Sequence, residues 1–260
     1  MNRRKKLKKK FKNKERVFGA WTSLAHSGIT EIFCQSGVDF VGIDIEHSTI
    51  SQGEARRIIS AAQAGGSLCL PRIASHNMEM VKRLLDSGAD GIIVPMVSTA
   101  EEVRDIISWL KYPPKGNRSY GIARGQDYGF DFENYTSSWN DTSTLIVQIE
   151  SVEGVENIEA ITAFEEVDGI MIGPYDLSGS LGIPGQLNHP KVQDACIKAL
   201  QMAHVAQKSC GTQLIEPNAE NMKASFDHGY DFVILASDVF LLWKWSEAMK
   251  VFIKQLRGTQ

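Results

Sequence analysis

The sequence predicts a TIM-type (β/α)8 barrel, and three observations support this fold class. Eight short apolar runs, most of them rich in β-branched residues, alternate with amphipathic helical stretches, as buried parallel strands do. Eight units in 260 residues allow about 32 residues per unit, which suits a closed barrel. Apolar residues make up 43% of the chain and charged residues 23%, a balance typical of a globular protein. We therefore expect residues 1–260 to form a single barrel domain.

The predicted strands occur along the whole chain after a basic lead-in. They are Val17–Thr22, Phe40–Ile45, Leu68–Ile73, Gly91–Val97, Leu145–Ile149, Gly169–Ile172, Gly211–Ile215 and Phe232–Ala236. A doubly wound open sheet is the structural alternative. No GxGxxG or P-loop sequence supports a nucleotide-binding version of that alternative.

The stretches between the strands have helical periodicity and helix signals. Helices are predicted over Gln52–Ala64, Ala100–Leu110, Val192–Gln207 and Phe240–Leu256, with Thr99 and Glu102 forming a capping box. Glycines stand where a left-handed residue ends a helix, at Gly37, Gly65, Gly88 and Gly229. A Gly-x-Asp echo at residues 37–39, 88–90 and 229–231, with a Val-Asp-Gly fragment at 167–169, marks repeated helix-to-strand turns.

Residues 1–16 differ from the rest of the chain in charge. They hold ten of the 28 basic residues and one acid, Glu15, whereas the remainder is acidic. The segment could be an arm for nucleic acid or an anionic membrane, or else a solvated first helix or a disordered lead-in. We favour the helix or lead-in over the arm, because Phe11 is the one aromatic residue in the segment and the body is acidic. A nucleic-acid partner is therefore not expected.

Targeting and redox signals predict a cytoplasmic protein. No apolar region follows the basic segment as in a signal peptide, and no apolar run reaches the roughly 18 residues of a membrane span. We therefore expect no membrane partner. Four scattered cysteines without a CxxC pair suit reduced thiols: Cys34, Cys69, Cys196 and Cys210.

Polar residues gather where predicted strands end, which is where barrel enzymes build active sites. Glu150 and Asp176 end consecutive runs, and neighbouring strands lie about 4.8 Å apart, so both carboxylates could bind one ligand. Two carboxylates with open positions suit Mg²⁺, with Mn²⁺ or Co²⁺ as alternatives. Singly, His47 or Arg72 could be a structural hydrogen bonder or an ion-pair partner. Together they indicate a catalytic site, because burying several charges is costly.

Two further patterns narrow the chemistry. Every lysine beyond the basic segment falls in a predicted helix or loop, so a Schiff-base lysine on a strand is not expected. Any aldol-type chemistry should therefore depend on a metal. No HExxH or GxSxG sequence is present. The segment Tyr112–Thr144 breaks the strand–helix rhythm and predicts a long functional loop.

Several of these stretches match one family, in order and across nearly the whole chain. They are Phe18–Trp21, Asp44–His47, Leu70–Arg72, Leu84–Gly88, Val94–Val97, Tyr112–Arg118, Val147–Glu150 and Ile172–Ser178. The chain resembles the 4-hydroxy-2-oxoheptanedioate aldolase family. These are metal-dependent class II pyruvate aldolases, and they include 2-dehydro-3-deoxyglucarate aldolase. Val-Gln-Ile-Glu followed by Gly-Pro-x-Asp-Leu-Ser is the specific part of the match.

The resemblance implies a role for each matching residue. It makes Glu150 and Asp176 the metal ligands, His47 the general base and Asp86 the residue that raises its basicity. Arg72 would stabilise the developing enolate oxygen, which suits its fixed positive charge. The substrate-binding set it implies is Gln148, Arg72 and the backbone around Gly173, Tyr175 and Asp176.

The resemblance also implies an oligomeric state, but it does not identify the aldehyde part of the substrate. It implies homo-hexamers built as trimers of dimers, with the last helix exchanged between neighbours; packing of Val239–Phe252 on its own barrel is the alternative. Tyr175 replaces the family's usual alanine, and the polar residues after Arg118 depart from its pattern. We expect this loop to face the aldehyde, so the pyruvate half of the site is retained and the acceptor half altered.

The predicted activity is therefore reversible cleavage of a 4-hydroxy-2-oxo acid, such as a 2-dehydro-3-deoxy sugar acid, to pyruvate and an aldehyde. Two alternatives use the same enolate chemistry: a carbon–carbon lyase acting on an acyl-CoA, and an oxaloacetate decarboxylase. A non-catalytic nucleic-acid or anion binder acting through the basic segment is the alternative from another class of protein.

Overall fold

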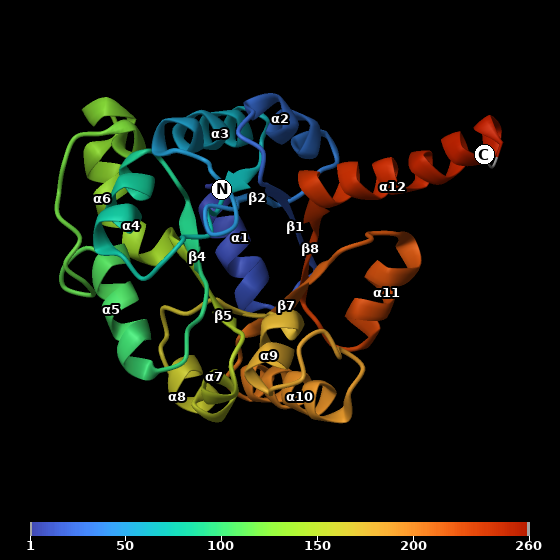
Figure 1. The fold of residues 1–260 in the computed structure, drawn as a ribbon. Coiled ribbons are helices and arrows are strands. Elements are labelled where there is room, and N and C mark those ends of the chain that lie inside the picture. The colour runs from blue at the N-terminus through green and yellow to red at the C-terminus, as the bar shows by residue number, and fades with distance from the viewer. Residues whose placement is uncertain (1, 259–260) are drawn as a thin grey trace.

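Eight parallel strands form a barrel in the computed structural model, which describes residues 2–258 (Figure 1). The strands lie in the order β3-β2-β1-β8-β7-β6-β5-β4. Their bounds are β1 Val17–Thr22, β2 Phe40–Ile43, β3 Leu68–Cys69, β4 Gly91–Val94, β5 Thr144–Ile149, β6 Gly169–Ile172, β7 Ser209–Leu214 and β8 Phe232–Ser237. The predicted fold class is confirmed.

The barrel closes between β3 and β4, where the pairing is sparse. Ile93 donates its backbone N–H to Pro71 at 2.9 Å, and Ile73 donates to Ile93 at 3.1 Å. Arg72 forms isolated bridges to Asp44 on one side and Ile93 on the other. Proline has no N–H to give to a ladder, so Pro71 interrupts this seam, and β3 ends before the predicted Ile73.

Helices surround the barrel between the strands, as predicted. They are α1 Arg3–Lys12, α2 Ser27–Gln35, α3 Gln52–Ala64, α4 Met78–Asp86, α5 Ala100–Leu110, α6 Phe132–Thr142, α7 Val152–Glu156, α8 Ile158–Thr162, α9 Pro174–Ser180, α10 Pro190–Val205, α11 Ala219–Asp227 and α12 Asp238–Arg257. The capping box of Thr99 and Glu102 is formed at the start of α5. Gly37, Gly88 and Gly229 have positive φ angles as expected, whereas at the end of α3 Gly66 takes that conformation in place of Gly65.

The segment 112–144 was predicted to be one long loop, and that prediction is wrong in its second half. A 3-10 turn, η1 (Arg124–Gly129), leads into the eleven-residue helix α6. Tyr135 and Trp139 lie one helical turn apart and are buried, with their rings stacked 4.9 Å apart. This buried stripe stabilises a helix in a stretch whose many polar residues obscure the helical pattern.

Helix α1 closes the amino-terminal end of the barrel, and in Figure 1 it crosses the middle of the view. Leu7 and Phe11 are buried and belong to the core cluster inside the barrel. Phe11 meets Phe232 edge to face, with 5.3 Å between ring centroids. The basic segment is therefore a helix, as one of the favoured alternatives predicted, but its apolar side completes the core, which was not predicted.

Four aspartates explain the Gly-x-Asp echo. Each precedes an even-numbered strand and accepts the backbone N–H of a residue in the strand before it, over 2.9–3.1 Å. The pairs are Asp39 with Phe18, Asp90 with Cys69, Asp168 with Leu145 and Asp231 with Cys210. A carboxylate that accepts such N–H groups satisfies donors that the ladder leaves unpaired.

The cations of α1 balance three of these four acids. Lys8 donates to Asp168 at 2.6 Å and Lys10 to Asp39 at 2.6 Å, while Arg4 lies 3.9 Å from Asp90. The fourth acid, Asp231, pairs with His204 from α10 at 2.8 Å. Part of the positive charge of the basic segment is thus used inside the fold.

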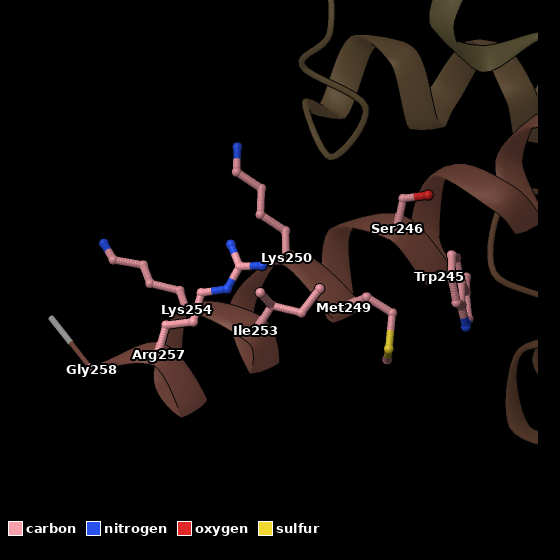
Figure 2. A pocket seen from close by; sticks show the side chains of 8 residues that line it. All are labelled: Trp245, Ser246, Met249, Lys250, Ile253, Lys254, Arg257 and Gly258. Atoms are coloured by element: carbon pink, nitrogen blue, oxygen red, sulfur yellow. The ribbon is translucent and has the colours of Figure 1, made fainter. Parts of the chain in front are cut away.

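Helix α12 extends away from the barrel and is exposed over most of its length (Figure 1). Its exposed apolar residues include Leu242, Trp245, Phe252 and Ile253. A groove of about 720 Å³ lies along it, lined by α12 side chains and Gly258; Figure 2 shows Trp245, Met249 and Ile253 beside Lys250, Lys254 and Arg257. Within residues 2–258, no helix is both long enough and apolar enough to cross a membrane.

Candidate active site

The predicted site residues that follow β2, β3, β5 and β6 lie together at the carboxyl ends of the strands. Their centre is Arg72, which follows β3 and is 8% exposed. Its Nη2 lies 2.8 Å from Asp44 Oδ1 and its Nε donates to the same oxygen at 3.1 Å. Its Nη1 lies 3.1 Å from Glu46 Oε2 and 3.5 Å from Gln148 Oε1. Arg72 is therefore a buried cation held from three sides.

Trp21 supports the guanidinium of Arg72 from inside the barrel. The Arg72 carbon Cζ lies 4.9 Å from the indole centroid, within the range of a cation–π contact. The Trp21 Nε1 donates to Gln213 at 3.2 Å. A Cβ at Gly42 would come within 2.2 Å of the indole, so glycine at this position of β2 makes room for the ring. The strand residues beneath the site thus fix the direction of Arg72.

Gln148 joins Arg72 to Glu150. The Gln148 Nε2 donates to Glu150 Oε1 at 3.0 Å, and the same oxygen accepts the backbone N–H of Met96 at 3.0 Å. Met96 has a φ of 54°, which is uncommon for a residue with a side chain. This strained backbone allows the N–H after β4 to face the Glu150 carboxylate.

Burial raises the pKa of two carboxylates of the site, Glu150 and Glu46. Burial, with smaller contributions from the charges of Glu46 and Asp176, raises the pKa of Glu150 to about 7. Burial also raises the pKa of Glu46, and the Arg72 charge opposes that rise. Glu46 Oε2 is buried and makes no hydrogen bond among the described residues, although Arg72 Nη1 is near it. The site therefore has more negative charge than its own cations satisfy.

Asp176 lies in the first turn of α9, directly after β6, and is exposed. Gly173 packs against Glu150: a Cβ there would lie 3.0 Å from Oε2. The Tyr175 side chain is 64% exposed and borders the following loop, where a Cβ at Gly185 would lie 3.6 Å from its hydroxyl. The phenol thus stands at the rim of the site, and the first-turn N–H groups of α9 have no acceptor within the helix.

His47 and Asp86 do not meet within one chain, so their predicted pairing stays a prediction. The His47 side chain is exposed and its Nε2 lies 3.6 Å from Glu46 Oε2. Asp86 ends α4 at the opposite end of the barrel, because the helices run antiparallel to the strands. There its carboxylate accepts a hydrogen bond from Arg118 Nη2 at 3.1 Å. The acid beside His47 is Glu46.

The loop after Arg118 was expected to face the aldehyde, and within one chain it does not. Arg124 Nη1 donates to Gln63 Oε1 and to the carbonyl of Ser87, both at the amino-terminal end of the barrel. Gln126 is buried and donates to the Tyr112 hydroxyl at 3.1 Å. These polar residues are used to fasten the segment to α3 and α4.

No individual role was predicted from the sequence for four residues of the site. Asp44 and Glu46 alternate along one strand direction, so a period of two could have placed both beside Arg72. Trp21 carried only a strand signal, and nothing in the sequence marks the left-handed backbone of Met96.

The donor set fits a hard divalent cation. Glu150 and Asp176 supply oxygens, and the buried Glu46 Oε2, which lies 3.1 Å from Arg72 Nη1, adds negative charge beside them. No group of three or more His, Cys, Asp or Glu side chains placed to hold a metal occurs within residues 2–258. Two protein ligands would leave the other positions to water and substrate, as Mg²⁺ commonly allows.

No strand residue of the described chain is lysine. The buried lysine, Lys111, lies at the other end of the barrel, where its Nζ donates to Asn140 and Ser143. Burial lowers its pKa to about 7, yet its N–H groups are committed to these acceptors. The prediction that no strand lysine is available for a Schiff base agrees with this arrangement.

The fold and the site define a β/α-barrel lyase class, and comparison with known proteins agrees. The HpcH/HpaI aldolase/citrate lyase family matches residues 17–244. A hydroxypyruvate/pyruvate aldolase of Roseobacter denitrificans is 35% identical over 250 residues, covering 96% of this chain and 97% of that protein. A 2-keto-3-deoxy-L-rhamnonate aldolase of Klebsiella pneumoniae is 34% identical, covering 87% and 85%.

Solved structures give the same result. An HpcH/HpaI aldolase from Desulfitobacterium hafniense superposes with a TM-score of 0.88 and 32% identity, covering 98% of each chain. The citrate synthase SbnG superposes with a TM-score of 0.84 and 29% identity, covering 96% and 97%. The chain belongs to the HpcH/HpaI aldolase/citrate lyase family. It is a carbon–carbon lyase of the class II pyruvate aldolase type, as the sequence predicted.

Replacing Arg72 with lysine should lower kcat about 10²-fold, with a smaller change in KM. An ammonium group cannot form the forked contacts to Asp44 and Glu46, so the charge would lose its fixed direction. Steady-state release of pyruvate measures the effect. Arg104→Lys, an exposed change on α5, is the matched control and should retain full activity; equal activity of the two variants would contradict a role for Arg72.

Divalent-metal affinity should rise with pH up to about 7, because Glu150 must lose its proton to become a ligand. Its folded-state pKa lies above its ordinary value of 4.5, so its protonated form favours folding. This stabilisation of the metal-free protein is present below pH 4.5 and is lost as the pH rises through about 7. Calorimetry with Mn²⁺ in two buffers counts the released proton, and an affinity independent of pH would refute the assignment.

Proposed function

We propose that the chain cleaves a 4-hydroxy-2-oxo acid reversibly to pyruvate and an aldehyde. The observation that carries the proposal is the buried Arg72 joined through Gln148 to Glu150 at the strand ends. This arrangement provides fixed positive charge beside carboxylates that can hold a cation. The named relatives act on small 2-oxo acids by their titles, which supports pyruvate as the common product.

Glu150 and Asp176 would hold the divalent cation, Mg²⁺ being our first choice and Mn²⁺ or Co²⁺ the alternatives. Such an ion, when bound, supplies Lewis-acid polarisation of the 2-oxo carbonyl. Arg72 lies next to these carboxylates and would offset the negative charge that develops on the substrate oxygen. The N–H groups of Tyr175 and Asp176 would orient the carboxylate of the substrate.

His47 would take the proton from the 4-hydroxyl group in the cleavage direction and return one in the reverse direction. An exposed imidazole with a carboxylate 3.6 Å from its Nε2 can accept a proton and return it. Glu46, which lies between His47 and Arg72, would support His47 within one chain, and the role that the resemblance gives to Asp86 stays a prediction.

The test is a substrate screen with purified protein. It would measure pyruvate release from 2-dehydro-3-deoxy sugar acids, and condensation of pyruvate or hydroxypyruvate with a panel of aldehydes. Activity should be lost with a chelator and restored by Mg²⁺, Mn²⁺ or Co²⁺. Faster turnover of oxaloacetate or an acyl-CoA than of every hydroxy-oxo acid would favour the decarboxylase or acyl-CoA lyase alternative.

The setting of this activity is part of the proposal. All four cysteines are buried free thiols, and burial raises the pKa of Cys196 to about 11. Such thiols suit a reducing compartment, so we propose a cytoplasmic enzyme. Residues 1–260 would act as one barrel domain.

We propose that α12 packs against a second copy of the chain, in dimers that assemble into hexamers. The support is the run of exposed apolar side chains on a helix whose sole buried residue in the described chain is Asp238. A monomer rarely exposes so large an apolar surface.

The variant Leu242→Gln/Phe252→Gln should therefore convert the assembly to smaller particles, because it removes two exposed apolar contacts from α12. Light scattering after size exclusion measures the mass of the particles. Gln255→Ala, a polar change on the same helix, is the control and should keep the native mass. A wild-type protein that elutes as a monomer would contradict the assembly.

A further inference from the structure

Helix α1 has a second face that the barrel interior does not use. Arg3, Lys6 and Lys10 recur at helical spacing on this face and line a cleft of about 270 Å³. The other wall consists of the turns that lead into β2 and β3, with the lining residues Cys34, Gly37, Val38, Asp39, Gly65, Gly66, Ser67 and Leu68. The cleft therefore lies at the end of the barrel opposite the catalytic residues.

The lining of the cleft is positively charged. Asp39 is its one acid, and that carboxylate already accepts Lys10 at 2.6 Å and the N–H of Phe18 at 3.1 Å. Arg3 uses Nη1 on the carbonyl of Gln63 at 3.2 Å. Lys6 has no partner within residues 2–258. Arg3 and Lys6 are therefore the two positive charges that no acid in the lining balances.

The wall of the cleft that faces Arg3 and Lys6 includes two glycines, Gly37 and Gly66, which have no side chain. A Cβ at Gly37 would meet no atom within 4 Å, and one at Gly66 would lie 3.8 Å from Arg3 Nη2. Both glycines have positive φ angles, of 80° and 91°, so side chains are disfavoured at these positions for conformational reasons as well. The space beside the guanidinium is thus open to a group that brings several acceptor oxygens.

We propose that this cleft binds the phosphate group of a small phosphorylated metabolite. A phosphate monoester presents its oxygens in a geometry that a guanidinium and an ammonium bind together. The carbonyl at the end of α3 that would repel an anion is already capped by Arg3. The phosphate would contact Arg3 and Lys6. These two cations of the basic segment do not pack in the core and do not pair with the acids at the strand starts.

The experiment titrates the full-length protein with glycerol 3-phosphate and with inorganic phosphate, by calorimetry at low ionic strength. We expect saturable binding of one phosphate per chain, weakened about tenfold or more in Arg3→Gln/Lys6→Gln. Lys5→Gln/Lys9→Gln removes the same charge from the outward face of α1 and should bind as the wild type does. Pyruvate release without phosphate should be the same in both variants.

A second variant, Lys6→Glu, keeps the bond from Arg3 to Gln63 and reverses one charge in the cleft, so it should also lose binding while its melting temperature is unchanged. The proposal is overturned if the wild type does not bind either probe, or if the two double variants lose binding equally. Binding of an RNA oligonucleotide that both double variants weaken equally, without binding of the phosphate ester, would show a general basic surface instead.

Discussion

Glu150→Gln and Asp176→Asn, singly or together, should lower metal-dependent pyruvate release about 10³-fold or more. Lewis-acid stabilisation of a developing oxyanion contributes several kcal/mol, and each 1.36 kcal/mol is a factor of about ten in rate. The amide variants keep the size of each side chain and remove the charge that would hold the cation. In Glu150→Gln the hydrogen bond from Met96 can still be accepted, so the local fold should persist.

Two measurements distinguish this loss from unfolding. Calorimetry should show weaker Mn²⁺ binding in both variants, while their melting temperatures stay close to that of the wild type. Glu153→Gln, an exposed change in the first turn of α7, is the control and should keep full activity. Unchanged pyruvate release by the double variant would refute the metal site and the metal-dependent mechanism.

The second large effect should come from the helix that closes the barrel. Phe11→Ala should lower the free energy of unfolding by about 3–5 kcal/mol, since the ring is fully buried and leaves a cavity. Its partners are Phe232 and Gly169; a Cβ on the glycine would lie 3.2 Å from the Phe11 ring. For a domain of this length, that corresponds to a fall in melting temperature of about 10 °C.

Lys9→Ala tests whether the effect belongs to the buried side of α1. Lys9 is exposed on the same helix, so its loss should change stability by no more than about 0.5 kcal/mol. Denaturant unfolding of the two variants, followed by circular dichroism, gives the comparison. Equal stability of Phe11→Ala and Lys9→Ala would show that α1 does not complete the core.

The period of the apolar residues predicted the barrel, because each buried strand needs a continuous run of them. Two strands, Val17–Thr22 and Gly169–Ile172, were predicted with their observed bounds. Helix α6 was missed, since its core side is reduced to Tyr135 and Trp139 in a polar stretch. Strand β3 is shorter than predicted, because Pro71 has no N–H to donate to the neighbouring strand.

The site was predictable where a single strand carries the residue and unpredictable where two distant segments must meet. Glu150 and Arg72 follow strands and were placed correctly at one end of the barrel. Asp86 was assigned to His47 by resemblance; within one chain the direction of α4 places it at the other end, and the pairing stays a prediction. The left-handed Met96 and the indole beneath Arg72 depend on tertiary packing, which no local pattern reveals.

The aspartates at the strand starts also show that the repeating module of this barrel is a quarter of it. Each acid links an even strand to the odd strand before it by a hydrogen bond to the backbone. Within residues 2–258 there are four such links, one for each pair of strands. Recombination between barrels of this type should respect these modules. A chimaera that exchanges β3 through α5 keeps the hydrogen bond from the Cys69 N–H to Asp90. A chimaera that exchanges a single strand and its helix separates the two partners, so the other parent must supply an equivalent acid.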